Sequence, residues 1–186
     1  MPDWIQRIDE WLLGWIAETL RTPMLDSVMV FVTGLGDGGL IFIAAAVILL
    51  LFRKTRIAGC SALAALGVGV VEVNLIIKPL VNRPRPYLVM EKLAALLPSP
   101  DGYSFPSGHT NAAFAFAVAL CLMLPAEYRA GKWMAVAAAC LMGFSRLYVG
   151  VHFPSDVLGG VVTGAAAALI GCLVVRKFAG QIRSRR

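Results

Sequence analysis

The sequence predicts an all-α protein, an integral-membrane helical bundle of about six transmembrane helices with an N-terminal interfacial helix. The 186 residues are 59% hydrophobic and only 15% charged, and the mean hydropathy is +0.76. A typical soluble domain is about 25% charged, so this much apolar surface indicates lipid as the solvent. Apolar stretches that are nearly long enough to span a membrane also recur along the chain, and basic residues gather between them.

The first segment, residues 1–22, is predicted to be an interfacial helix that leads into the bundle. Apolar residues recur in it at helical spacing, with charges on the other face: Trp4, Ile5, Ile8, Trp11, Leu12, Trp15 and Ile16. An amphipathic helix of this kind lies in the membrane surface and does not cross it. The segment lacks a basic region followed by an apolar core, so it is not predicted to be a signal peptide.

Four stretches of mostly apolar residues are predicted to span the membrane, at roughly 57–77, 108–124, 133–150 and 155–175. A fifth, about 39–52, is shorter and continuously apolar. Residues 24–35 form another apolar piece, which a glycine-rich segment ends. The bundle has six spans if this piece crosses and five if it does not. A single domain is expected over 1–186, comprising the interfacial helix, a transmembrane bundle over 24–175 and a basic cytoplasmic tail over 176–186.

Basic residues orient the predicted bundle. Ten of the seventeen Lys and Arg lie in three places that fall on one side if the four long stretches alternate: residues 53–56, 129–132 and 176–186. The positive-inside rule makes that side cytoplasmic. The connections 78–106 and 150–154 then face the extracytoplasmic side of a multi-pass cell-membrane protein. The net charge of +6 is thereby explained by topology, and no nucleic-acid partner is expected.

The first polar segment at that face carries three cations. Lys78, Arg83 and Arg85 fall within eight residues. Pro84 and Pro86 exclude a regular helix around the two arginines. A guanidinium binds phosphate oxygens through two donors, and an ammonium acts as a point charge. The segment predicts an anion site at the membrane boundary; the alternative is a basic patch on the membrane surface.

The second polar segment, Pro106-Ser107-Gly108-His109, opens the stretch 108–124. Proline suits the first positions of a helix, and glycine lets the backbone approach a ligand closely. Free N–H groups and the helix dipole at such a start bind phosphate well. The alternative is an ordinary helix start followed by an interfacial histidine.

The third polar segment connects the last two apolar stretches. Arg146 ends one stretch and Asp156 begins the next, and charges so deep in a membrane are costly and mark function. Asp156 can hold one ring nitrogen of His152 and leave the other free as a nucleophile. The alternative for Asp156 is a dipole partner of the last helix, and both roles are compatible. The chain has two histidines, and both belong to these polar segments.

Together, the three segments resemble the type 2 phosphatidic acid phosphatase (PAP2) superfamily, over about residues 24–175. The matching motifs, with matching spacing, are Lys78…Arg85-Pro86, Pro106-Ser107-Gly108-His109 and Ser145-Arg146…His152…Asp156. The resemblance implies a membrane phosphatase in which His152 attacks phosphorus and forms a phosphohistidine. It implies that Asp156 orients His152, and that His109 protonates the leaving oxygen and then helps to activate water. It also implies five residues that hold the phosphate oxygens: Lys78, Arg85, Ser107, Gly108 and Arg146.

No metal and no other cofactor are expected. The sequence has no Asp/Glu cluster that would hold Mg²⁺, and fixed cations supply the charge stabilisation that a metal provides elsewhere. The cysteines lie singly in apolar runs without metal-ligand spacing, and they are predicted to be buried small hydrophobic residues: Cys60, Cys121, Cys140 and Cys172.

The expected substrate is a lipid phosphate or diphosphate, because the site lies at a membrane surface among lipid-facing helices. By analogy with small members of the family, undecaprenyl diphosphate is the first choice, and phosphatidylglycerophosphate or phosphatidate is the alternative. A different class, a non-catalytic protein that binds or transports a lipid phosphate, is disfavoured because binding needs no nucleophile. A soluble vanadate-dependent haloperoxidase is disfavoured by the hydropathy.

Asn74 shares a helix face with Lys78, and three further features keep two interpretations each. Glu72 either lines the route to the site or forms a buried hydrogen bond. Residues 88–98, with apolar side chains on one helical face, form a lid or an inert connector. Asp37, among glycines, contacts a headgroup or forms a turn.

Overall fold

The computed structural model describes residues 1–91, 93–97 and 102–184. Regular structure in these residues is entirely helical, which confirms the predicted all-α class. The α-helices are α1 (Asp3–Thr19), α2 (Pro23–Leu35), α3 (Leu40–Leu50), α4 (Arg56–Val70), α5 (Lys78–Val81), α6 (Pro86–Val89), α7 (Gly108–Met123), α8 (Arg129–Tyr148) and α9 (Pro154–Ser184). Shorter helical turns are η1 (Asp37–Gly39), the π-helix η2 (Val71–Ile77) and η3 (Ala126–Tyr128).

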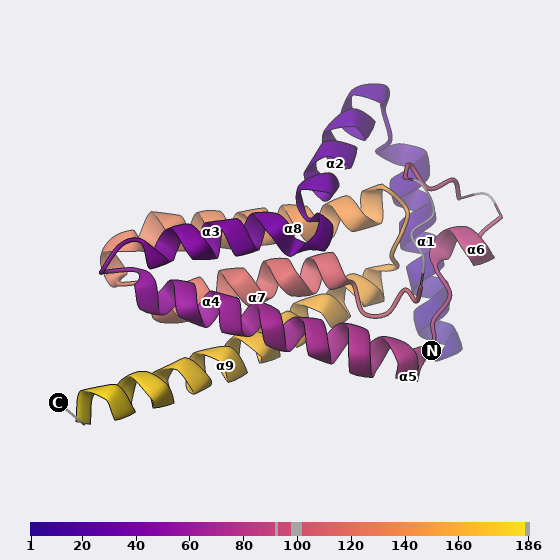
Figure 1. Ribbon diagram of the computed structural model, residues 1–186. Helices are drawn as coiled ribbons and strands as arrows, with labels where there is room; N and C mark the ends of the chain where they lie inside the picture. The colour runs from indigo at the N-terminus through magenta and orange to yellow at the C-terminus, as the bar shows by residue number, and fades with distance from the viewer. Residues whose placement is uncertain (92, 98–101, 185–186) are drawn as a thin grey trace.

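The bundle is formed by α3, α4, α7, α8 and α9, which run alongside one another (Figure 1). Small residues dominate its interior, including Ala62, Ala65 and Ala117, which are fully buried. A Cβ at Gly171 of α9 would lie 2.5 Å from the backbone nitrogen of Ala65 in α4. Small side chains let helix backbones approach this closely, as is usual between membrane helices.

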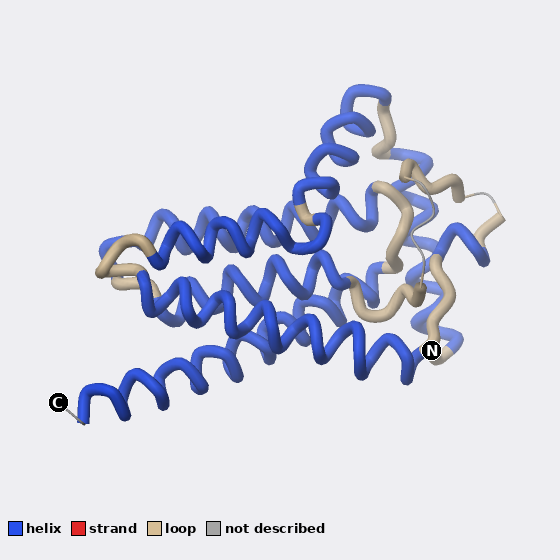
Figure 2. Tube along the Cα trace, in the orientation of Figure 1, coloured by secondary structure: helices blue, strands red, loops and turns tan. Residues whose placement is uncertain are grey.

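The two ends of the bundle differ in charge and in content. The α3–α4 and α7–α8 connections and the C-terminal end of α9 lie at one end, and α1, α6 and the described parts of the α6–α7 connection lie at the other (Figures 1 and 2). The two basic connections touch, since Lys54 Nζ lies 2.9 Å from Glu127 Oε1. The chain therefore places the predicted basic side opposite the three polar segments.

Two helical stretches in the described residues are long and apolar enough to cross a membrane, Arg56–Val89 and Pro154–Ala179. Taken together, α2 and the following η1–α3 segment are also long and apolar enough to cross a membrane, with a bend of 45° between them. α7 is apolar but shorter. The number of crossings, and whether 24–35 crosses alone, stay predictions.

Several boundaries differ from the predicted ones. α8 begins at Arg129 and ends at Tyr148, which shifts it towards the basic connection. α9 continues to Ser184, so the predicted tail extends the last helix; residues 185 and 186 lie outside the described residues. The helical face predicted over 88–98 is wrong beyond Val89 in the residues that the structure describes. α6 ends at Val89, and residues 93–97 are irregular, whereas 92 and 98 are outside the described residues.

α1 crosses the end of the bundle that carries the polar segments (Figure 1). Trp4, Trp11 and Trp15 are exposed on its outer face, and Leu13 and Ile16 are buried on its inner face. An outward aromatic stripe is typical of a helix in a membrane surface. The inner face of α1 packs against the segment that follows α6, because Leu13 and Leu93 belong to one buried hydrophobic cluster.

The cysteines are free thiols, and their predicted burial holds only in part. Cys172 is buried, whereas Cys60 and Cys140 are exposed on the protein surface. Both exposed cysteines lie on bundle helices. An apolar run therefore identified a bundle helix without identifying which of its faces is internal.

Candidate active site

Ser107 caps the start of α7. Its hydroxyl accepts hydrogen bonds from the Thr110 N–H at 3.4 Å and from the Thr110 hydroxyl at 2.9 Å, which satisfies a free donor of the first helical turn. The Ser107 N–H donates to the carbonyl of Asp156 at 3.0 Å. The starts of α7 and α9 are therefore tied together. The sequence had left open whether this segment is an ordinary helix start, and Ser107 does act as a helix cap. A phosphate contact from Ser107 stays a prediction.

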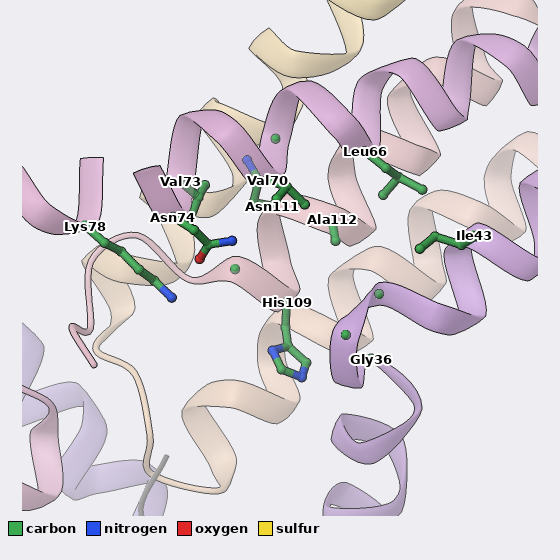
Figure 3. Close-up of a pocket in the computed structure, with 14 residues that line it drawn as sticks. Gly36, Ile43, Leu66, Val70, Val73, Asn74, Lys78, His109, Asn111 and Ala112 are labelled. Carbon is green, nitrogen blue, oxygen red and sulfur yellow. The ribbon is translucent and has the colours of Figure 1, made fainter. Parts of the chain in front are cut away.

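A cavity of about 260 Å³ lies between the start of α7, the π-helix η2 and the α2–α3 junction (Figure 3). Its polar end contains Lys78, Gly108 and His109. Its apolar wall is formed by Ile43, Leu66, Val70, Val73 and Ala112. A charged end beside an apolar wall suits a ligand with an anionic head and a hydrophobic tail.

Asn74 lines the same cavity as Lys78, one helical turn before it (Figure 3), in agreement with their spacing. Glu72 is not among the residues that line the cavity. Its Oε2 atom is buried and has no hydrogen-bond partner in the described part of the chain. Both residues belong to η2, and π-helical turns are frequent at functional sites.

Asp37 contacts His109. Its Oδ1 lies 3.0 Å from His109 Nε2, and it belongs to the short turn η1 after α2. The turn that the sequence favoured is present, but the carboxylate also has a partner in the site. Because the Asp37 side chain is 75% exposed, it connects the imidazole of His109 with the surface.

We expect Gly36→Ala to lower turnover roughly tenfold, because a misplacement of about 1 Å at a reacting group costs up to about a hundredfold. A Cβ at Gly36 would lie 2.6 Å from His109 Cδ2 and 2.8 Å from Met142 Sδ. The backbone at Gly36 has a φ of −84°, which alanine adopts freely, so only this steric clash acts. Phosphate-release kinetics of the purified variant measure the effect.

Gly34→Ala is the matched control for that substitution. Gly34 lies two residues earlier in α2, and a Cβ there meets nothing within 4 Å. Its activity is expected to equal that of the unmodified chain. Equal turnover in the two alanine variants would contradict a role for the position of His109.

His152 is almost completely buried between three side chains. It is 2% exposed, and its Nε2 lies 3.4 Å from Arg85 Nη1. On the other side of the ring, Nδ1 lies 3.4 Å from Ser104 Oγ and 3.7 Å from Asp156 Oδ2. A guanidinium can only donate, so Nε2 is the acceptor in the contact with Arg85 and is the unprotonated ring nitrogen. The proton of the neutral ring then lies on Nδ1, towards the carboxylate.

Burial lowers the pKa of His152 to about 3, and the nearby positive charges of Arg146 and Arg85 act in the same direction, against Asp156. The imidazole is therefore neutral at physiological pH. A neutral ring with an unprotonated Nε2 is the nucleophilic form of histidine.

Asp156 is fully buried and has a partner for each oxygen. Oδ1 accepts a hydrogen bond from Arg83 Nη1 at 2.6 Å. Oδ2 accepts one from the Phe153 N–H at 2.7 Å and one from the Ser104 hydroxyl. A carboxylate with these donors cannot rotate freely, so one oxygen remains directed towards His152.

The two predicted arginines of the site are buried in different ways. Arg85 donates from Nε to the Gly102 carbonyl and from Nη1 to the Val151 carbonyl, both at 3.2 Å. Arg146 donates to the Thr33 hydroxyl. Its Nε is buried without a hydrogen-bond partner among the described residues, and an unsatisfied buried donor is costly unless a ligand pairs with it.

Arg83 departs from the sequence interpretation, which grouped it with the anion-binding cations. Its guanidinium is 5% exposed and is paired with two carboxylates, those of Asp9 and Asp156. Like Arg85, Arg146 and His152, it is not among the residues that line the cavity. What sets Arg83 apart is that both of its terminal nitrogens are held by carboxylates, so it supports Asp156.

Sequence reasoning missed Ser104 and Asp9 as members of this cluster. Ser104 lies in the loop before the second motif, and Asp9 is a single charge on an amphipathic helix. Neither belongs to a motif with a recognisable spacing.

The sequence profile of the PAP2 superfamily matches residues 55–179 of this chain. The chain belongs to the PAP2 superfamily. The match includes all three motifs, which confirms the resemblance drawn from them. The protein is accordingly an enzyme, a phosphatase of that family.

Curated relatives agree with this assignment. The undecaprenyl-diphosphatase BcrC of Bacillus subtilis is 37% identical over 165 residues, which cover 84% of this chain and 76% of the relative. An undecaprenyl-diphosphatase of Sulfolobus acidocaldarius is 33% identical over 144 residues, which cover 76% of this chain and 66% of the relative. The match therefore spans just under two thirds of the archaeal protein and about three quarters of BcrC.

Solved structures show the same fold. The crystal structure of Aquifex aeolicus LpxE has a TM-score of 0.76 and 30% identity, over 88% of this chain and 94% of that one. A transmembrane PAP2-type phosphatidylglycerolphosphate phosphatase from Bacillus subtilis has a TM-score of 0.72 and 30% identity, over 97% of this chain and 89% of that one. The likeness to a transmembrane enzyme over nearly the whole chain supports the membrane bundle.

Proposed function

We propose that this protein hydrolyses the terminal phosphate of a lipid diphosphate at the extracytoplasmic face of the membrane, through a phosphohistidine on His152. The observation that carries the chemistry is the setting of this buried ring. Arg85 lies at its Nε2, and Asp156 lies at its Nδ1. A binding protein needs neither a free ring nitrogen nor a carboxylate behind it.

The proposed reaction has two steps. In the first, the Nε2 electron pair of His152 bonds to phosphorus, the bond from phosphorus to the leaving oxygen breaks, and His109 gives that oxygen a proton. In the second, water attacks phosphorus while His109 takes a proton from it, and the phosphorus–nitrogen bond breaks to release inorganic phosphate. Asp156 stabilises the positive charge that the imidazole acquires in between.

Fixed positive charge replaces a metal in this proposal. Lys78, Arg85 and Arg146 supply cations, and Gly108 supplies a backbone N–H at the start of α7. The described residues contain no group of three or more His, Cys, Asp or Glu side chains placed to hold a metal ion. We therefore expect phosphate release without a divalent cation.

The side of the membrane follows from charge. The basic connections lie at the end of the bundle opposite the site (Figure 1), and the positive-inside rule assigns that end to the cytoplasm. The site then opens on the extracytoplasmic face, beside the interfacial helix α1. This sidedness supports a substrate whose phosphate is presented outside the cytoplasm.

Undecaprenyl diphosphate is the proposed substrate, and its leaving group is undecaprenyl phosphate. Two relatives that are similar over most of this chain are described as undecaprenyl-diphosphatases, and the cavity combines a cationic end with an apolar wall. Phosphatidylglycerophosphate is the second candidate. It is supported by the phosphatidylglycerophosphatase B of Bacillus subtilis, 33% identical over 86% of this chain, and by the similar solved structure.

A phosphate-release assay on the purified chain in detergent tests the proposal with undecaprenyl diphosphate, phosphatidylglycerophosphate, phosphatidate and a soluble monoester. We expect kcat/KM to be highest for undecaprenyl diphosphate, by about tenfold, because pocket contacts of one or two kcal/mol discriminate to that extent. Faster hydrolysis of phosphatidylglycerophosphate would favour the second candidate. Tight lipid binding without release from any lipid would favour a transport protein.

A further inference from the structure

A buried guanidinium connects the N-terminal helix with the carboxylate beside His152. Arg83 Nη1 donates to Asp156 Oδ1 at 2.6 Å, and Arg83 Nη2 donates to Asp9 Oδ2 at 2.7 Å. The exposed fractions of the three side chains are 5% or less. Water therefore screens these charges little, and the geometry of one pair affects the other.

Other contacts hold the α1 side of this connection in place. Gln6 Oε1 accepts a second hydrogen bond from Arg83 Nη2 at 2.7 Å. Asp9 Oδ1 accepts one from the Ser155 N–H at 2.9 Å, and Asp9 Oδ2 accepts one from the Ser155 hydroxyl. The guanidinium also lies 4.1 Å from the centre of the Phe153 ring. A planar fork with fixed donor directions suits this arrangement, and a lysine ammonium does not.

We infer that Asp9 and Arg83 are positioning residues for the phosphatase reaction, which make α1 part of the catalytic apparatus. This inference rests on the proposed phosphohistidine mechanism. Arg83 holds one oxygen of Asp156, and that leaves the other oxygen directed towards His152 Nδ1. The imidazole becomes positively charged when phosphorus bonds to Nε2, so a displaced carboxylate weakens the stabilisation of that step and slows it.

Replacement of Asp9 by asparagine weakens the hold of α1 on Arg83 for a specific reason. An asparagine has one acceptor oxygen where Asp9 has two, and its amide is neutral. If the amide oxygen stays with the Ser155 N–H, the NH₂ group faces the Arg83 guanidinium where Oδ2 accepted. If the oxygen stays with Arg83, the NH₂ group faces the Ser155 N–H, and in both cases the charge that paired with Arg83 is lost. The change lies outside the substrate cavity, because neither Asp9 nor Arg83 lines it.

The test compares Asp9→Asn with Asp3→Asn in steady-state kinetics on undecaprenyl diphosphate, with kcat normalised to folded protein by thermal unfolding. Asp3 is exposed in the first turn of the same helix, so the control removes an equal charge from α1. We expect Asp9→Asn to lower kcat about tenfold or more and to leave KM within about twofold of the unmodified value. We expect Asp3→Asn to change neither. A KM effect without a kcat effect, or equal losses in both variants, overturns the inference.

Arg83→Lys provides a second measurement that is independent of how well Asp9→Asn folds. We expect kcat to fall about a hundredfold, because an ammonium cannot donate to Asp9, Asp156 and Gln6 with the same geometry. The double variant, which carries Asp9→Asn and Arg83→Lys, should be no slower than Arg83→Lys alone, since both substitutions break the same connection between α1 and Asp156. Additive losses would mean that the two residues act separately, and would overturn the inference.

The two proposals fail in different ways. If His152→Ala retains full activity, the phosphohistidine mechanism is wrong whatever Asp9 does. If His152→Ala is inactive and Asp9→Asn is as fast as the unmodified chain, only the positioning role is wrong.

Discussion

Replacement of His152 by alanine is expected to abolish phosphate release, with kcat lower by about 10⁴-fold or more, as for the loss of a nucleophile in other covalent mechanisms. No described side chain replaces its free Nε2, which lies in a buried position beside Arg85. The measurement is release of inorganic phosphate by the purified variant. Acid-labile incorporation of ³²P from labelled substrate into the unmodified chain, and its absence in the variant, reports the intermediate directly.

Two controls make this result specific. Thermal unfolding of His152→Ala in the same detergent shows whether the variant is folded, since removal of a buried side chain also leaves a cavity. EDTA is expected to leave the activity of the unmodified chain unchanged, because the proposed mechanism uses fixed cations. A fully active His152→Ala protein, or activity that EDTA removes and Mg²⁺ restores, would contradict the mechanism.

The second large effect is expected for Asp156→Asn, with kcat lower by about 10³- to 10⁴-fold. Arg83 donates to Oδ1, so the amide oxygen must occupy that position. The NH₂ group then replaces Oδ2 and faces the Phe153 N–H and His152 Nδ1. An amide donor at Nδ1 favours the tautomer with its proton on Nε2, and that nitrogen then has no electron pair for attack on phosphorus.

Asp26→Asn is the matched control for this substitution. Asp26 lies at the start of α2 and accepts a hydrogen bond from the Tyr148 hydroxyl at 2.8 Å. The substitution Asp26→Asn is expected to change kcat little. Equal kcat for Asp156→Asn and the unmodified chain would show that this carboxylate does not set the tautomer of His152. A loss of equal size in Asp26→Asn would point to a general effect of lost carboxylates.

The motifs predicted which residues gather, because each lies at the end of an apolar stretch and alternation of the stretches brings those ends to one face. Lys78, Gly108 and His109 line one cavity, and Arg85, His152 and Asp156 meet in a second cluster, whose members are not among the residues that line it. The predicted helix boundaries agree less closely with those in the structure. Hydropathy marks where a chain is apolar, whereas capping and tertiary contacts decide where a helix ends.

Partners across the bundle were beyond sequence reasoning. Arg83 lies two residues from Arg85 and has the same chemistry, yet Asp9 and Asp156 occupy it. The sequence left Asp37 between a headgroup contact and a turn, and its contact with His109 joins residues 72 positions apart. Charge pairing and distance separate these cases, since Arg83 and Arg85 are about equally buried, and neither can be obtained from composition or spacing.

The sequence by itself determined the class of fold, the family and the residues around which the site is built, because hydropathy, charge placement and motif spacing are properties of the chain alone. The tertiary structure decided which ring nitrogen of His152 is free, which cations are available to a ligand and which support Asp156. It also decided that α1 reaches the site. The physical reason is that protonation, hydrogen-bond partnership and charge pairing depend on distances between side chains that only the folded bundle brings together.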